Sequence, residues 1–241
     1  MAQRLDPAVL LGAYSVGVFP MADSRDAEGV YWVEPRRRAI LPLDRFHLSR
    51  SLRKVIIADR FRVTHDRAFG QIVRLCAESA ADRPETWINA SIEQVFEQLH
   101  TMGHAHSIEC WLGDELVGGL YGLSIGRAFF GESMVSRATN ASKVSIAALV
   151  ARLRVGGYAL LDCQFMTDHL ATLGAVEISR GAYMALLAAA LGASSDSSGA
   201  DASGAATATD FGAFDRLAVG DGAAAGSPPG KLIAQLLVHT S

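Results

Sequence analysis

The chain has 241 residues, 50% of them hydrophobic and 20% charged, which excludes disorder of the whole chain and predicts one good core with room for a smaller second domain. Its formal net charge of -3 excludes a uniformly basic surface. Three cysteines without a CxxC spacing favour neither a disulfide framework nor a structural zinc site, and the lack of a long apolar run predicts a soluble, cytoplasmic protein without signal peptide or membrane span.

The N-terminal residues predict a small domain over residues 1–60. Asp6 and Pro7 are typical of an N-cap and a first helical position, and they predict a helix that runs toward Phe19. Two further elements complete this unit: a proline-bounded extended stretch at residues 30–43 and a helix at residues 49–59.

Basic residues gather in residues 36–67, which hold ten Lys or Arg against three Asp. Clustered arginines bind phosphate well because the guanidinium group donates to two oxygens at once. The stretch therefore predicts an anionic partner, although a solvated basic face is the simpler explanation of the pattern taken by itself.

From residue 61 the pattern changes to that of a larger α+β unit. Residues 61–66 predict a strand, and a helix follows Asp66. A second helix is expected to begin with a capping box from Ser91 to Gln94 and to end at Gly103.

Three strand-like runs follow at short spacing, over residues 106–113, 115–126 and 127–135. The turn residues between them favour an antiparallel meander. A helix over residues 140–154 should come next.

The run "ALLDCQF", residues 159–165, predicts a buried strand that two polar residues interrupt. Side chains alternate along a strand, so Asp162 and Gln164 should share one face. A carboxylate without partners is costly to bury. The pair therefore belongs either to a hydrogen-bonded core network or to a cleft, and the strand alone favours neither.

The C-terminal third predicts a helix at residues 180–191, a flexible Ala/Gly/Ser-rich insertion at residues 193–230, and a returning strand at residues 231–241. These elements predict an α+β fold with a mainly antiparallel sheet flanked by helices.

Several blocks share their order and spacing with one protein family, over most of residues 8 to 190. They are "YWVEPRRRAIL", "TWI", "LHTMGHAHSIECW", "ELVGGLYGLSIGRAFFGESM", "NASK", "LLDCQ" and "HLATLGAVEISR". In these blocks the chain resembles the leucyl/phenylalanyl-tRNA protein transferases. The resemblance implies a GNAT-like catalytic domain over residues 61–192. It also implies transfer of Leu or Phe, with Met as a further substrate, from aminoacyl-tRNA to the N-terminal amine of proteins that begin with Lys or Arg, which marks those proteins for degradation. It implies no cofactor and no metal, and we expect a monomer.

The resemblance also assigns catalytic residues. Aminolysis of an ester needs an uncharged amine and a stabilised oxyanion. The amide oxygen of Gln164 could accept a hydrogen bond from the amine while Asp162 polarises the amide, and the tRNA ribose hydroxyl could instead move the proton. Glu132, the second carboxylate, is expected to pair with the basic N-terminal side chain of the acceptor or to form a structural ion pair.

Binding residues follow from the same resemblance. For the aminoacyl-adenosine end of the donor it implies stacking on Trp32 and Trp87 and an apolar pocket made by Leu120, Phe129, Ile146, Leu149 and Leu161. The rest of the tRNA is expected to bind to the basic stretch, through Arg36, Arg37, Arg38, Arg50, Arg53 and Lys54.

Two other classes of enzyme share single features with this sequence. An acyl-CoA-dependent N-acyltransferase has a pyrophosphate loop that "RVGGYA", residues 154–159, matches, but the loop should precede a helix and here it follows one. A metal or thiol enzyme would use His104, His106, His169 and Cys163. These histidines lack a recognisable ligand spacing, and Cys163 should point away from Asp162 and Gln164.

Overall fold

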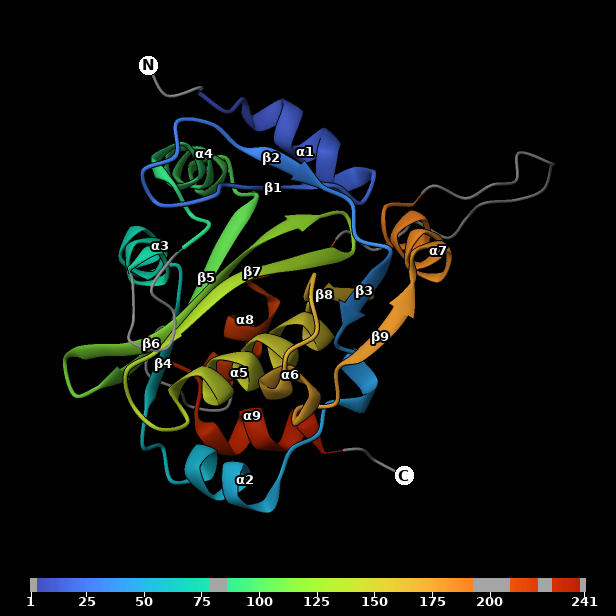
Figure 1. Ribbon diagram of the computed structural model, residues 1–241. Helices are drawn as coiled ribbons and strands as arrows, with labels where there is room; N and C mark the ends of the chain where they lie inside the picture. The colour runs from blue at the N-terminus through green and yellow to red at the C-terminus, as the bar shows by residue number, and fades with distance from the viewer. Residues whose placement is uncertain (1–3, 79–85, 193–208, 221–226, 239–241) are drawn as a thin grey trace.

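The computed structural model describes residues 4–78, 86–192, 209–220 and 227–238. Figure 1 shows an α+β fold in which helices cover both faces of a seven-stranded sheet, with strand order β4-β5-β6-β7-β8-β3-β9. Neighbouring strands are antiparallel except β7 and β8, which are parallel. The predicted α+β class and the mainly antiparallel sheet are confirmed. The strands of this sheet are β3 (Arg37–Ile40), β4 (Arg62–His65), β5 (Ala105–Leu112), β6 (Glu115–Ile125), β7 (Ala128–Ser136), β8 (Leu160–Asp162) and β9 (Val176–Ser179).

The N-terminal part begins with α1 (Pro7–Ser15), and the side chain of Asp6 accepts hydrogen bonds from the amides of Ala8 and Val9. The predicted N-cap is confirmed. The helix ends before the predicted limit because Gly17 adopts a φ of 80°. A two-stranded antiparallel sheet follows, made by β1 (Phe19–Met21) and β2 (Tyr31–Val33).

The later residues of the predicted N-terminal unit pack with the large sheet. Strand β3 lies between β8 and β9, and α2 (Arg50–Ile57) contacts α5 (Ala141–Val155) and α9 (Gly230–Leu237). Elements on both sides of the predicted boundary at residue 60 therefore belong to the same sheet and core. These elements join the large sheet and its core through contacts with residues far apart in the chain, and the local sequence carries no signal for such contacts.

The predicted helices of the central region are present as α3 (Phe69–Ala77) and α4 (Ala90–Thr101). The predicted capping box is wrong, because the side chain of Asn89 accepts from the amide of Ile92 and Ser91 lies inside the helix. Gly103 ends α4 with a φ of 81°, as predicted. The meander of β5, β6 and β7 is also confirmed.

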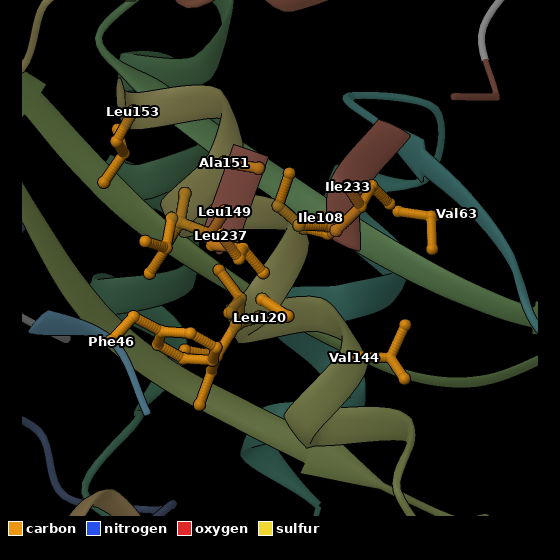
Figure 2. Close-up of a cluster of buried hydrophobic side chains, with 14 of the residues drawn as sticks. Phe46, Val63, Ile108, Leu120, Val144, Leu149, Ala151, Leu153, Ile233 and Leu237 are labelled. Carbon is orange, nitrogen blue, oxygen red and sulfur yellow. The ribbon is translucent and has the colours of Figure 1, made fainter. Parts of the chain in front are cut away.

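Each face of the sheet has its own hydrophobic core. Helices α2, α5, α8 (Ala213–Gly220) and α9 cover one face, and Figure 2 shows part of the core beneath them. Helices α1, α3, α4 and α7 (Arg180–Ala190) cover the other. Adjacent residues of β8 separate accordingly, with Leu161 in the first core and Leu160 in the second. The predicted alternation therefore holds from Leu160 to Asp162.

Two C-terminal expectations are wrong. The predicted last strand is a helix, α9, whose apolar residues Leu232, Ile233 and Leu237 are buried against the first core. Within the predicted flexible insertion, α8 is an ordered helix because Phe211 and Phe214 are buried. The rest of that insertion, at residues 193–208 and 221–226, lies outside the described residues.

A short helix, α6 (Asp168–Ala171), joins β8 to β9. None of the helices in the described ranges has the length and apolarity that a membrane crossing requires.

Candidate active site

The segment that follows β8 turns sharply. The strand ends at Asp162, and Gln164 adopts a φ of 55°, in the left-handed region that non-glycine residues seldom occupy. The amide of Gln164 donates to Oδ1 of Asp162 at 2.8 Å, and its carbonyl oxygen accepts from the amide of Ala39 at 3.0 Å. These bonds hold a backbone conformation that costs about 1–3 kcal/mol, and such strain is concentrated at functional sites.

Asp162 is fully buried and its carboxylate has several donors. Arg38 binds it through two nitrogens, with Nε 2.9 Å from Oδ1 and the terminal NH2 group 2.6 Å from Oδ2. The hydroxyl of Tyr183 donates to Oδ2 at 2.8 Å. The guanidinium group of Arg38 also lies 4.6 Å from the ring centre of Phe19 and 4.7 Å from that of Tyr183. A paired charge in this setting is satisfied on all sides.

This arrangement corrects the prediction for Arg38, which is 1% exposed and is not part of a tRNA-binding surface. It also corrects the prediction for Asp162. The carboxylate of Asp162 bonds the backbone amide of Gln164, not its side-chain amide.

The side-chain amide of Gln164 donates instead to Glu132, with Nε2 3.1 Å from Oε1. The hydroxyl of Tyr14 donates to Oε2 of the same carboxyl at 2.8 Å. Burial raises the pKa of Glu132 to about 8, and the charge of Asp162 adds to this, while the bonds from Tyr14 and Gln164 and the charge of Arg38 oppose it. Burial also raises the pKa of Tyr14, as does Glu132. Glu132 thus changes charge near neutral pH.

Gln164 and Glu132 line one part of a cavity of about 700 Å³. Five of the seven residues predicted for the aminoacyl-adenosine site also line it: Trp87, Leu120, Ile146, Leu149 and Leu161. Phe19 and Met21 of β1 and His169 of α6 complete parts of the wall. The structure therefore brings the predicted polar residues and an apolar wall together in one cavity.

Two predicted residues lie elsewhere. Phe129 has no exposed surface and stacks on Phe211 in the first core, with ring centres 5.8 Å apart. Trp32 lies on β2, where it pairs with Pro20 and is 42% exposed. Trp32 is thus one strand away from the cavity wall formed by β1.

Cys163 lines the same cavity as Gln164, so the prediction that it points away from Gln164 is wrong, whereas Asp162 does not line this cavity. The left-handed turn at Gln164 breaks the alternation on which that prediction depended. Burial raises the pKa of the Cys163 thiol, and Asp162 raises it further, which disfavours a thiolate nucleophile.

The structure adds three residues that the sequence analysis did not assign to the site: Tyr14, Tyr183 and, in a new role, Arg38. One signal was available for Arg38. Because strand residues alternate, Arg37 and Arg38 must face opposite sides of the sheet, so one of them had to point inward. The partners of the two tyrosines lie 118 and 21 residues away along the chain, and no local pattern predicts such bonds.

The other residues that were predicted to bind tRNA form two exposed groups. Arg36 and Arg37 lie at the start of β3, where Arg37 pairs with Glu177. Arg50, Arg53 and Lys54 lie on the outer side of α2. In Figure 1 the start of β3 adjoins β2, whereas α2 lies at the lower end of the molecule.

The two other classes of enzyme find no support in the geometry. The glycines of "RVGGYA" end α5, with Gly156 as C-cap and Gly157 at a φ of 76°, and the chain then enters β8. No helix N-terminus is there to bind phosphate. Among the described residues, no three His, Cys, Asp or Glu side chains gather as a metal site would require. His106 is bound to Asp66, with Nδ1 2.8 Å from Oδ2.

Comparison with known proteins gives two family matches. Residues 40–188 match the family model described as leucyl/phenylalanyl-tRNA protein transferase, and residues 3–36 match the model of its N-terminal domain. A leucyl/phenylalanyl-tRNA protein transferase of Rhizorhabdus wittichii is 65% identical over 190 residues, which cover 79% of this chain and 77% of that protein. The protein of the same description from Zymomonas mobilis is 60% identical over 191 residues, covering 79% and 71%, and that from Paramagnetospirillum magneticum is 57% identical over 183 residues, covering 76% and 88%.

Among solved structures the similarity is weaker. FemX has 12% identity and a TM-score of 0.47, with 71% of this chain and 66% of FemX covered. A structure titled L-PGS from Bacillus licheniformis has 11% identity and a TM-score of 0.44, with 65% of each chain covered.

Proposed function

The chain belongs to the leucyl/phenylalanyl-tRNA protein transferase family, and we propose that the cavity lined by Glu132 and Gln164 is where its transfer reaction takes place. Its activity is leucyl/phenylalanyl-tRNA protein transfer, with an aminoacyl-tRNA as donor and a protein as acceptor. The proposals that follow concern the residues that perform this transfer and the finer choice of substrates.

One observation carries the placement of the reaction: an apolar wall and a pair of polar side chains face the same cavity. Leu120, Ile146, Leu149 and Leu161 supply the wall, and a side chain of Leu or Phe is apolar and needs no polar partner. Such a wall discriminates strongly against polar side chains and weakly between apolar ones. The strained Gln164 then lies where the ester carbonyl of the donor would meet the amine.

The 3′ adenosine of the donor fits the aromatic residues beside this wall. Trp87 lines the cavity, and the exposed face of Trp32 on β2 offers a stacking surface next to β1. Stacking of one base on an aromatic side chain is worth about 1–3 kcal/mol. We assign the adenine to this edge of the cavity.

The exposed basic residues would hold the rest of the tRNA. Arg36, Arg37, Arg50, Arg53 and Lys54 remain candidates, and Arg38 does not. The resemblance of the sequence blocks supports the finer substrate proposals: acceptors that begin with Lys or Arg, marking of these acceptors for degradation, and action in the cytoplasm as a monomer.

The function is tested by incubating the protein with tRNA carrying labelled Leu or Phe and a peptide that begins with Arg. Label should appear on the peptide. The same peptide with an acetylated N-terminus is the matched control and should remain unlabelled, because it has no free amine. Label that comes from an acyl-CoA and not from the tRNA would overturn the assignment.

A further inference from the structure

The two carboxylates of the site have different surroundings, and only one is directed to the cavity. Asp162 is enclosed, and its oxygens accept from Arg38, Tyr183 and the backbone of Gln164. Glu132 lines the cavity and receives the side-chain amide of Gln164. A proton that leaves an amine held at Gln164 therefore finds Glu132 nearby, whereas Asp162 has no free side to receive it.

The orientation of the Gln164 amide supports the same conclusion. Its NH2 group faces Glu132, so its carbonyl oxygen is left to accept from another donor. An ammonium group is such a donor. Gln164 can therefore hold the acceptor amine through its oxygen while its nitrogen remains attached to Glu132.

We propose that Glu132 is the base that takes the proton from the α-ammonium group of the acceptor, with Gln164 holding that group and Tyr14 positioning the carboxylate. This role rests on the proposed function of the cavity. It replaces the expectation that Glu132 pairs with the basic side chain of the acceptor.

The step balances as follows. The ammonium group gives one proton to the carboxylate of Glu132, and the neutral amine attacks the ester carbonyl. The new N–C bond forms and the bond from the carbonyl carbon to the 3′ oxygen of the ribose breaks. The nitrogen loses a second proton, which the leaving 3′ oxygen takes up, so the product is an amide. Glu132 finally releases its proton to water, and one proton per turnover enters solution.

The charged and titratable groups that face Glu132 come from several elements. They are Tyr14 on α1, Arg38 on β3 and Asp162 on β8, and Tyr121 on β6 acts on Tyr14. Burial and the charge of Asp162 raise the pKa of Glu132 to about 8, against the opposing effects of the Tyr14 bond and the Arg38 charge. A free α-amino group has a pKa of roughly 8, so proton transfer between the two groups is nearly balanced. A carboxyl that is mostly protonated at neutral pH would in contrast be a weak partner for a Lys or Arg side chain.

Tyr14→Phe tests the base directly. The bond from Tyr14 lowers the pKa of Glu132, so its loss should raise that pKa. The single-turnover rate at saturating acceptor should rise with pH to a plateau, and its half-maximum should move to higher pH in Tyr14→Phe. Glu132→Gln keeps an oxygen for the Tyr14 hydroxyl but cannot take a proton. It should lower the plateau by about 10²-fold or more, and adding Tyr14→Phe to Glu132→Gln should then cause no shift.

A pair of acceptors separates the two roles of Glu132. One peptide begins with arginine and its matched control begins with citrulline, which has nearly the same shape and no charge. If Glu132 is the base, Glu132→Gln slows both peptides by the same factor and keeps the ratio of their KM values. A loss of the preference for arginine would overturn the proposal, because it would make Glu132 the partner of the side chain.

The outcomes also separate this proposal from the function itself. Transfer by the unmodified protein together with an unmoved half-maximum in Tyr14→Phe overturns only the role of Glu132. Absence of transfer by the unmodified protein would overturn the function of the cavity and this role with it. If Tyr14→Phe does not fold, the Glu132 carboxyl carbon of the unmodified protein is titrated by 13C NMR, with Glu132→Gln identifying its resonance. A titration that does not match the kinetic half-maximum overturns the proposal.

Discussion

Asp162 and Gln164 lie two residues apart in the chain, and their side chains make different contacts. The carboxylate of Asp162 is a partner of Arg38 inside the second core, and its side chain has no exposed surface. Gln164 uses its backbone to complete that buried network and its side chain to reach Glu132 and the cavity. Both readings of the sequence pattern therefore apply, one to each residue.

Asp162→Asn should lower stability far more than Gln164→Ala does. Removing the charge of Asp162 leaves the guanidinium group of Arg38 buried without its partner, which costs about 3–5 kcal/mol. Gln164→Ala removes one side-chain hydrogen bond and should cost roughly 0.5–1.5 kcal/mol. Urea unfolding of both variants measures the difference.

Activity should rank the two variants differently. The surviving folded fraction of Asp162→Asn should retain more single-turnover rate than Gln164→Ala, because only Gln164 is proposed to touch the amine. Equal stability with equal loss of rate would show instead that the carboxylate of Asp162 acts in the chemistry.

At the scale of the element, local signals predicted local features. Asp6 caps α1, Gly103 ends α4, and short turns join β5, β6 and β7, as expected from residues within each element. Features that depend on distant partners were not predicted. Strand β3 joins the sheet through β8 and β9, and α9 is a helix because its apolar residues pack against α2 and α5.

The site follows the same division. The residue types around the cavity were predicted by resemblance, and five of the seven aminoacyl-adenosine residues line it. The sequence did not predict the bond from Tyr14 to Glu132 or the pairing of Arg38 with Asp162, because each joins segments more than 100 residues apart.

Asp215 of helix α8 makes a charged contact with the rest of the fold. Asp215 accepts from both terminal nitrogens of Arg152, at 2.6 and 2.8 Å, and the side chain of Arg152 is 3% exposed. His65 lies 2.9 Å from the same carboxylate. Because Phe214 of α8 is buried in the first core, loss of this contact should expose part of that core.

Asp215→Asn should therefore loosen α8. It leaves the guanidinium group of Arg152 poorly paired, and hydrogen exchange of the α8 amides should become faster. Asp210→Asn is the matched control, because its pair with Arg216 is exposed and worth only about 0–1 kcal/mol. Equal exchange in the two variants would show that Phe211 and Phe214 hold α8 without help from the ion pair.

The same contact gives α8 a dependence on pH with a definite sign. Burial raises the pKa of Asp215, but the bonds and charge of Arg152 outweigh this and lower it from its ordinary value. A carboxyl with a lowered pKa in the folded state stabilises that state above its unfolded pKa of about 3.9, and the contribution disappears as pH falls through the folded value.

His65 adds a second pH dependence of stability, at higher pH than that of Asp215. Burial lowers its pKa, and the charge of Arg152 lowers it further. The folded state thus favours the neutral ring, and stability should begin to fall as pH drops below about 6.5. Relative to the intrinsic exchange rate at each pH, exchange of the α8 amides should accelerate on acidification, first as His65 takes up a proton and then as Asp215 does. Exchange that slows relative to the intrinsic rate would contradict both assignments.

The whole molecule carries a net charge of -3 and still offers basic surfaces to a polyanion. The predicted tRNA-binding residues form two such surfaces, at the start of β3 and on α2, and in Figure 1 only α2 lies at the lower end of the molecule. The group on β3 adjoins β2 and Trp32, where the 3′ adenosine is proposed to stack. The group on α2 is farther from this edge and could meet only a more distant part of the tRNA.

Charge reversal should distinguish the two groups. Arg50→Glu with Arg53→Glu should raise the KM for charged tRNA and reduce the dependence of binding on salt, since each lost phosphate contact lowers the slope of log K against log salt by about 1. Turnover of a minimal aminoacyl-adenosine donor should be unchanged, because that donor lacks the acceptor stem. Arg36→Glu is the matched comparison at the start of β3, since Arg36 is exposed and precedes Arg37, which already pairs with Glu177. If the α2 variant impairs both donors equally, α2 serves the fold and not the tRNA; if it impairs neither, the tRNA is held at the start of β3 alone.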